Sequence, residues 1–182
     1  MTVLLPVVPD RYRAIVATAG GAGLRWGEAA GLCADAIDLD QRRLRVIRTI
    51  IEVSGQTSFK PFPKSAAGRH PILLPPWLVE IIREHRESYP SGENGLMFPN
   101  AVGKPLRRTL FRSRVWRPAL VRAGMLGTVT VVDDNTVRAG WVDATGAELV
   151  KEFSTEREAV LHIARLCVGG LRFHDLRHSY AT

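Results

Sequence analysis

The 182-residue sequence contains few cysteines and no long apolar run. Cys33 and Cys167 are its only thiols, and two thiols do not make the disulfide framework of a small secreted protein. No apolar stretch approaches the roughly 20 residues that cross a bilayer. The opening MTVLLPVVPD lacks the basic start of a signal peptide and contains two prolines. These absences disfavour the disulfide-rich and membrane-spanning classes, and we expect a reducing, cytoplasmic setting.

Acidic residues are absent between positions 94 and 132, although the whole chain has 18 of them against 25 Lys and Arg, a net charge of +7. A solvated helix face normally mixes both signs, so this segment predicts contact with the phosphates of double-stranded DNA. We expect some of its arginines to pair with Asp or Glu elsewhere. The basic residues are Lys104, Arg107, Arg108, Arg112, Arg114, Arg117 and Arg122, of which we assign Lys104, Arg107, Arg108, Arg112 and Arg114 to DNA binding.

Periodicity and turn residues predict a mostly helical α+β domain with a small antiparallel hairpin region. Helices are expected over 10–19, from about 23, over 76–89, and over 107–123 with a bend at Pro118. Strands are expected over 43–53, 57–60 and 69–74, with PFPKSAAG as an exposed turn between the last two.

Residues 125–170 have a different character. They read as three short strands and a helix, with Ser154 or Thr155 as its N-cap and Trp141 and Phe153 as its core. Four basic and seven acidic residues give this segment a net charge of −3, which leaves +10 for the rest. We therefore interpret 125–170 as an inserted α+β subdomain within a domain formed by 1–124 and 171–182.

Three segments carry the chemistry that we expect: GLRWGEAAGL around Arg25, PKSAAGRHPILLP around Lys64, and HDLRHSYAT from His174. In this order, with a strand hairpin between the outer two, they resemble the catalytic domain of the phage-type tyrosine recombinases (integrases). The first matches the family's arginine box, the second its lysine turn, and the third its His-x-x-Arg-His box. The resemblance covers about 9–124 and 171–182.

The resemblance implies site-specific DNA recombination through a 3′-phosphotyrosine intermediate, with no metal, nucleotide or other cofactor. Displacement at a phosphodiester builds negative charge on the non-bridging oxygens, which planar guanidinium groups meet best; we place Arg25 and Arg177 there. Lys64 would protonate the leaving 5′ oxygen, and His174 would act as acid and base or bind a phosphate oxygen. Glu28 and His178 would support the site.

The family's nucleophilic tyrosine lies tens of residues beyond the second box. The chain's tyrosines are Tyr12, Tyr89 and Tyr180, and Tyr180 stands where the family carries a core residue. We therefore expect the chain to be truncated before the nucleophile and inactive alone. The intact parent would act as a tetramer on two duplexes. An alternative is a nonenzymatic DNA-binding or decoy subunit, and a third is an interaction module that keeps the boxes only as structure.

Three other interpretations are weaker. His174 and His178 have the spacing of zinc ligands, but the cation of Arg177 between them would repel a metal. The GGAG before Arg25 lacks the GK[ST] of a phosphate-binding loop. The run WVDATGAELVKEFSTEREAVLHIA is similar to the three-strand-plus-helix module with which many integrases grip arm-type DNA. Because 125–170 is acidic, we expect protein contact or a spacer there instead.

Overall fold

The computed structural model describes residues 2–61 and 71–179. It divides into two compact units: unit 1 contains Pro9–Thr109 and Phe173–Thr182, and unit 2 contains Thr2–Val8 and Leu110–Arg172. No helix within the described ranges is long and apolar enough to cross a membrane.

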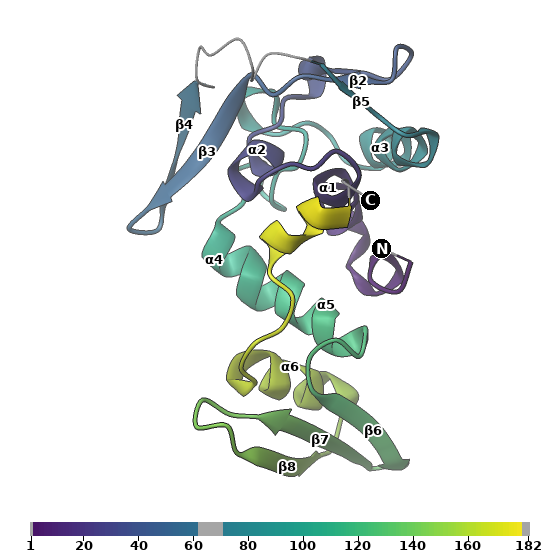
Figure 1. Cartoon of the computed structure of the whole chain (residues 1–182), viewed down its shortest axis with the longest axis vertical. Helices are drawn as coiled ribbons and strands as arrows, with labels where there is room; N and C mark the ends of the chain where they lie inside the picture. The colour runs from purple at the N-terminus through teal and green to yellow at the C-terminus, as the bar shows by residue number, and fades with distance from the viewer. Residues whose placement is uncertain (1, 62–70, 180–182) are drawn as a thin grey trace. The chain divides into compact units, whose positions relative to one another are not determined.

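Unit 1 is built from helices and two small antiparallel sheets (Figure 1). Its helical elements are α1 (Asp10–Gly21), α2 (Trp26–Ala30), α3 (Pro76–Ser88) and the 3-10 helices η2 (Ala34–Ala36), η4 (Glu93–Gly95) and η6 (Phe173–Ser179). Its strands are β1 (Ile37–Asp38), β2 (Arg43–Leu44), β3 (Arg48–Val53), β4 (Gln56–Pro61) and β5 (Ile72–Leu73). One sheet has the order β1-β2-β5, and β3 and β4 form a separate hairpin.

Helix α1 is the centre of unit 1. Ile15, Val16 and Ala17 are fully buried on consecutive positions, so the helix is covered on more than one side. It packs against α2, α3 and η6, and Figure 1 shows η6 lying beside it although the two are far apart in sequence. The predicted helices over 10–19 and 76–89 are confirmed, with α1 ending at Gly21.

The strand expected over 43–53 is two strands in two sheets. Leu44 in β2 pairs with Ile72 in β5, whereas Ile50 in β3 pairs with Phe59 in β4. Leu44 and Ile50 are both buried and lie an even number of residues apart, so the alternation continues across the break and hides it. The predicted single strand is therefore wrong, and the predicted return strand is confirmed as β4.

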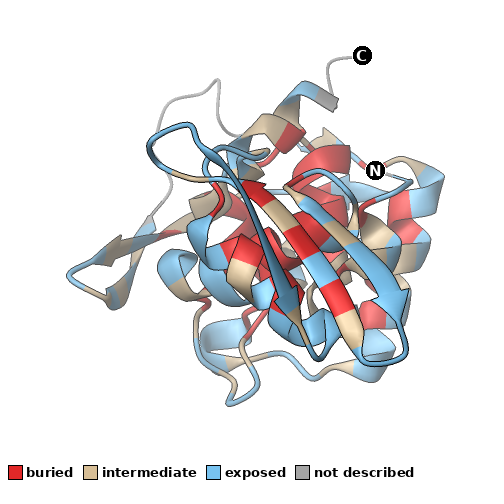
Figure 2. Cartoon of the chain, turned by 90° about the horizontal axis from the view of Figure 1, so that it is seen from below, coloured by how far each residue is buried: buried red, intermediate tan, exposed pale blue. Residues whose placement is uncertain are grey.

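Unit 2 contains the expected three strands and helix. Its elements are η1 (Leu5–Val7), the π-helix η5 (Arg112–Trp116), α5 (Arg117–Arg122), β6 (Thr128–Asp133), β7 (Thr136–Val142), β8 (Glu148–Phe153) and α6 (Glu156–Leu166). Helix α4 (Arg108–Phe111) contains the boundary between the units. The sheet order is β6-β7-β8, and Figure 2 shows buried and exposed residues alternating along its central strand.

One face of this sheet is covered by α6. Val137, Ala139 and Trp141 of β7 are buried on that side, together with Val160 and Ile163 of α6. Thr155 is the N-cap of α6: its hydroxyl oxygen accepts a hydrogen bond from the Glu158 N–H at 3.2 Å, as one of the two predicted caps. Phe153 of the predicted core is only half-buried.

The helix expected to bend at Pro118 changes its winding before that residue. Residues 112–116 form a π-helix, and α5 begins at Arg117. Proline lacks an N–H and its ring crowds the carbonyl four residues earlier, so the preceding turn widens. The compact units divide at Thr109/Leu110 and Arg172/Phe173, not at 125 and 170. These borders describe compactness and do not test whether 125–170 is an inserted segment, which stays a prediction.

Candidate functional site

Arg25 stands immediately before the first turn of α2, as its N-cap. The buried Glu28 carboxylate accepts a hydrogen bond from the Arg25 backbone N–H at 2.8 Å and another from its Nη1 at 3.1 Å. Glu28 therefore fixes both the start of the helix and the direction of the arginine. The Arg25 side chain remains 63% exposed, so this ion pair orients the guanidinium without enclosing it.

Two glycines hold α2 close to β3. A Cβ on Gly27 would lie 2.6 Å from the Ile50 carbonyl oxygen, and one on Gly31 would lie 2.9 Å from the Ile50 nitrogen. Only glycine allows this approach of two backbones. Arg48 of β3 fixes the other end of α2, donating from Nε to the Gly31 carbonyl at 3.1 Å and from Nη2 to the Asn94 carbonyl at 2.7 Å. No local pattern in the sequence indicates this anchoring role of Arg48.

The HDLRHS segment forms the 3-10 helix η6. With three residues per turn, Phe173 and Leu176 lie on one row, and His174 and Arg177 lie on the next. Leu176 is buried, and Phe173 and Arg177 are half-buried, whereas His174 and His178 are exposed. The packed row thus docks η6 on α1, and the adjacent row presents His174 and Arg177 together.

The two boxes meet at a ring contact. Trp26, which follows Arg25, lies edge-to-face against Phe173, which precedes His174, with a centroid separation of 5.1 Å and an interplanar angle of 83°. Such pairs contribute about 0.5–1.5 kcal/mol beyond the area they bury. Segments almost 150 positions apart are therefore brought side by side.

Asp175 is the third residue of η6 and lies within its first turn. The type of helix also bears on the zinc interpretation of this segment. His174 and His178 have the i, i+4 spacing that aligns side chains in an α-helix but places them on different rows of a 3-10 helix. No cluster of three or more His, Cys, Asp or Glu in the described parts of the chain is arranged to hold a metal ion. Lys64 lies outside the described residues.

The basic segment has several separate structural roles. In unit 1, Lys104, Arg107 and Arg108 are exposed; in unit 2, Arg112 and Arg114 are exposed. Arg107 pairs with Glu52 at 3.5 Å, as expected for some of these residues. Glu52 also accepts the Thr109 hydroxyl at 2.9 Å. Burial would raise the pKa of Glu52, but hydrogen bonds from Thr109, the Arg108 backbone and Arg107 together lower it.

Arg117 is a structural residue. It is 7% exposed, and its guanidinium donates to the carbonyls of Ala164 at 2.5 Å, Gly169 at 3.0 Å and Cys167. These carbonyls lie at and just after the end of α6, where helix carbonyls lack partners within the helix. Arg117, which we did not assign to DNA binding, therefore stabilises the fold, because its guanidinium donates to the carbonyls at the end of α6.

Two proteins of known family are similar to this chain in sequence. A prophage phiRv2 integrase from Mycobacterium tuberculosis is 36% identical over 101 residues, which are 55% of this chain and 26% of that protein. A tyrosine recombinase XerC-like protein from Caldanaerobacter subterraneus subsp. tengcongensis is 29% identical over 135 residues, 63% of this chain and 34% of that protein. The chain is similar in sequence to a phage integrase and to a tyrosine recombinase XerC-like protein.

The fold agrees as well. The Tn1549 transposon integrase, solved in complex with a circular intermediate DNA, matches 94% of this chain and 45% of that chain with a TM-score of 0.59 and 13% identity. The structure thus has the fold of a tyrosine-recombinase catalytic domain. No family model matches the chain. The aligned segment spans about a quarter to a third of the length of these curated relatives.

Proposed function

We propose that the chain is part of an enzyme that cuts and rejoins DNA at specific sites, integrating or excising a phage or another mobile element in the bacterial cytoplasm. The Trp26–Phe173 contact carries the proposal, because it brings the arginine box and the His-x-x-Arg-His box together. The relatives are an integrase and a recombinase by name, and the structural neighbour holds DNA.

In the proposed reaction, Arg25 and Arg177 bind the non-bridging oxygens of one phosphodiester. A tyrosine oxygen attacks phosphorus, a 3′-phosphotyrosine bond forms, and the bond to the 5′ oxygen breaks. The negative charge that grows on the phosphate is neutralised by the two guanidinium groups, which offer paired donors in fixed planes. Glu28 is a positioning residue, since it orients Arg25 through two hydrogen bonds.

Proton transfer is assigned to two other residues. His174 shares its row of η6 with Arg177, so it reaches the same phosphate and acts as acid and base there. Lys64 protonates the leaving 5′ oxygen. His178, on the neighbouring row, supports the site. The reaction then reverses with the 5′-hydroxyl of a partner strand, and the intact enzyme acts as a tetramer on two duplexes.

Residues 1–182 do not cleave DNA by themselves in this proposal, because the family's nucleophile lies further past the second box than Tyr180. The Tyr89 ring packs against two other side chains. The Arg11 guanidinium lies 4.6 Å from its ring centroid, and the centroid of the His85 ring lies 5.0 Å from it. The alternative, a DNA-binding or decoy subunit that occupies sites without cutting them, predicts binding without an adduct in every form of the protein.

Contact with the DNA backbone is assigned to Lys104 and Arg108 of unit 1 and to Arg112 and Arg114 of unit 2, all exposed, with Arg107 shared between Glu52 and DNA. Fluorescence anisotropy with a labelled duplex across a salt series tests this. Arg112→Ala is expected to reduce the slope of log affinity against log salt by about 0.9, the loss of one phosphate contact. Arg138→Ala, which removes a cation paired with Glu152, is the control and is expected to leave the slope unchanged.

The chemistry is tested with the gene product that includes whatever the reading frame encodes after Thr182. On a nicked suicide duplex it is expected to form a covalent protein–DNA adduct. Arg177→Ala is expected to reduce the adduct rate at least about a hundredfold with little loss of affinity, since the group acts in the transition state. Arg157→Ala, an exposed arginine on α6, is the matched control. An equal loss of affinity and rate would make Arg177 a binding residue, and no adduct from the intact product would favour the decoy.

A further inference from the structure

A cavity of about 580 Å³ lies within unit 2, where the end of α6 meets η5 and α5. Arg112 and Arg117 line it from the helix side, and Arg165, Leu166 and Val168 from the end of α6 and the residues that follow. Its size falls within the range of about 300–1,000 Å³ that is typical of ligand pockets. The candidate catalytic residues belong to unit 1, so the cavity is not part of that site.

The cavity concentrates positive charge. Among the residues that the structure describes, its lining includes three arginines and no carboxylate. Arg117 is buried among carbonyl oxygens, which are dipoles and carry no net charge. Burial lowers the pKa of Arg117, and the nearby charge of Arg112 lowers it further. A buried charge is normally accompanied by an opposite one, so the cavity favours an anionic group.

Exposed apolar side chains line the cavity beside the exposed Arg112 and Arg165. Leu161, Leu166 and Val168 are 45%, 43% and 43% exposed and all line it. A phosphate backbone has no apolar group that could cover three aliphatic side chains. A polypeptide with aliphatic and acidic residues covers them and also supplies the anion. The combination therefore favours a protein segment over nucleic acid.

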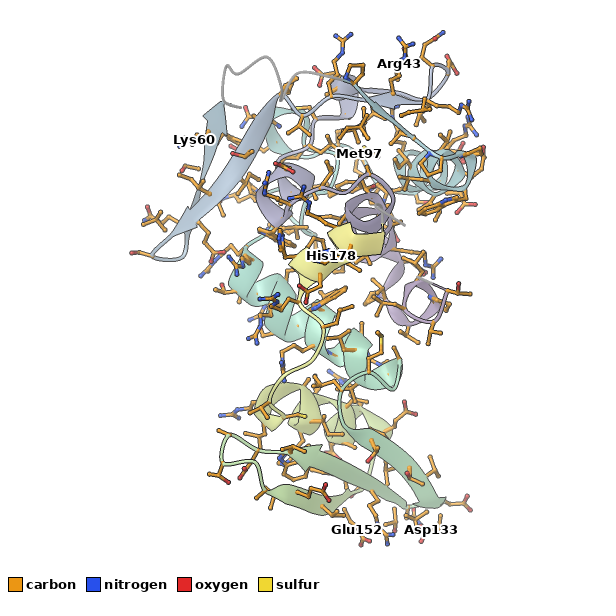
Figure 3. The ribbon with its side chains drawn as sticks, in the orientation of Figure 1. Arg43, Lys60, Met97, Asp133, Glu152 and His178 are labelled. Atoms are coloured by element: carbon orange, nitrogen blue, oxygen red, sulfur yellow. The ribbon has the colours of Figure 1, made fainter. Side chains whose placement is uncertain are left out.

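The β6–β7 hairpin has this composition at its tip. Val131 and Val132 are 65% and 47% exposed, and the exposed Asp133 and Asp134 follow them. The pairing register shifts between Val131 and Asp133, so the strand is irregular there. Asp133 accepts the Asn135 N–H at 2.9 Å and is used within the turn, which leaves Asp134 as the outward acid. Figure 3 places Asp133 at the free end of the hairpin.

The tip and the cavity do not meet within one copy, since no tip residue lines the cavity and both belong to unit 2. We propose that the cavity receives the β6–β7 tip of a second copy of the chain, with Asp134 against Arg165 and the two valines against Leu161, Leu166 and Val168. Each copy has one tip and one cavity, so an exchange about a two-fold axis closes a dimer.

Pairing of two β8 edge strands is a competing way to self-associate. Antiparallel pairing centred on Val150 would place Glu148 opposite Glu152 of the second copy, and like charges directly opposite each other are destabilising. The tip-in-cavity contact has no such clash, and it brings together an acidic and a basic surface.

Sedimentation equilibrium of the 182-residue chain across a concentration series, without DNA, tests the proposal. Asp134→Arg and Arg165→Asp are each expected to weaken self-association about tenfold or more, and the double variant is expected to recover most of the loss. Glu148→Arg and Arg157→Asp make the same charge changes at exposed positions outside the tip and cavity, and are expected to have no such effect.

A monomer at every concentration would overturn the proposal, as would a double variant no better than the single ones. If Arg165→Asp lowered duplex affinity while self-association stayed unchanged, the cavity would be a DNA site. Circular dichroism of each variant separates loss of association from loss of fold. The experiment needs no DNA cleavage, so its failure leaves the recombinase proposal unaffected.

Discussion

The Trp26 and Phe173 rings meet edge-to-face at 5.1 Å, and this contact joins the start of α2 to the start of η6. Arg25 lies one residue before the first ring, and His174 lies one residue after the second. Both rings are half-buried, and their contact adds to the packing of the buried Leu176, on the same row as Phe173, in holding η6 on unit 1. The placement of the two candidate arginines therefore depends on two rings that have no assigned role in the chemistry.

Removing one ring should loosen the site before it unfolds unit 1. Trp26→Ala is expected to lower the free energy of unfolding by about 1–3 kcal/mol, because a half-buried aromatic side chain loses its partner. Trp26→Phe, which keeps a ring, is expected to retain most of the stability and the adduct rate. Urea titration and the adduct assay measure the two effects. An unchanged adduct rate in a folded Trp26→Ala protein would mean that the contact does not position the boxes.

Gly27 tests the close approach of α2 to β3. Gly27→Ala places a Cβ 2.6 Å from a backbone carbonyl that cannot move alone, and is expected to cost about 1–3 kcal/mol. Gly95→Asn is the control: Gly95 has φ +70° and open space around it, a conformation that asparagine tolerates. Thermal unfolding compares them, and equal stability of the two variants would count against the packing described.

Arg117 should be essential to the stability of unit 2 and should take no direct part in DNA cleavage. Arg117→Leu leaves three carbonyls at the end of α6 without their donor, and is expected to destabilise the protein by about 2–4 kcal/mol. Arg117→Lys is expected to recover little, since an ammonium lacks the planar set of donors. Arg122→Ala, an exposed neighbour on α5, should cost less than about 0.5 kcal/mol. Hydrogen exchange of the α6 amides would locate the loss.

His85 should make stability fall in acid. Burial lowers the pKa of its ring, Nε2 lies 3.1 Å from the Met97 carbonyl oxygen, and the ring packs 5.2 Å from Phe98. The native state thus favours neutral His85 more than the unfolded state does. This stability is complete above the unfolded pKa of about 6.5 and declines as pH falls toward the lowered folded pKa, by at most about 1.4 kcal/mol per pH unit.

Urea unfolding at about pH 7.5 and about pH 5.5 measures this contribution. His85→Leu is expected to lower stability at the higher pH but to reduce the difference between the two. The same pH difference in His85→Leu and the unmodified protein would assign the acid sensitivity to other groups.

The sequence predicted most elements whose periodicity or caps are local. Helices α1 and α3 and the Thr155 cap follow from Pro9, Pro76 and the Ser-Thr pair near the point where each helix begins. It missed what depends on distant partners. Buried residues alternate without interruption from Leu44 to Ile50, so the sequence shows no break between two strands. The break is visible only from the pairing, because Leu44 and Ile50 belong to different sheets.

For the site, the boxes predicted Arg25, His174 and Arg177 as site residues, which stays a prediction, but not the type of helix that carries the last two. In a 3-10 helix, side chains three positions apart align, unlike in an α-helix. The packing of Phe173 and Leu176 stabilises this form. The same holds for Arg117: its sequence neighbours suggested a phosphate contact, whereas carbonyls about 50 positions away determine its role. The role of Arg48 likewise depends on carbonyls that no local pattern reveals.

The proposed chemistry requires that the Arg25 and Arg177 guanidinium groups bind one anion. Nitrogen-15 NMR of the arginine Nε–H groups, during titration of the chain with orthovanadate, tests it most directly. Both signals are expected to shift along one binding curve, and Arg177→Ala is expected to remove the shift of Arg25. Separate curves for the two residues, or an Arg25 response that survives Arg177→Ala unchanged, would contradict it.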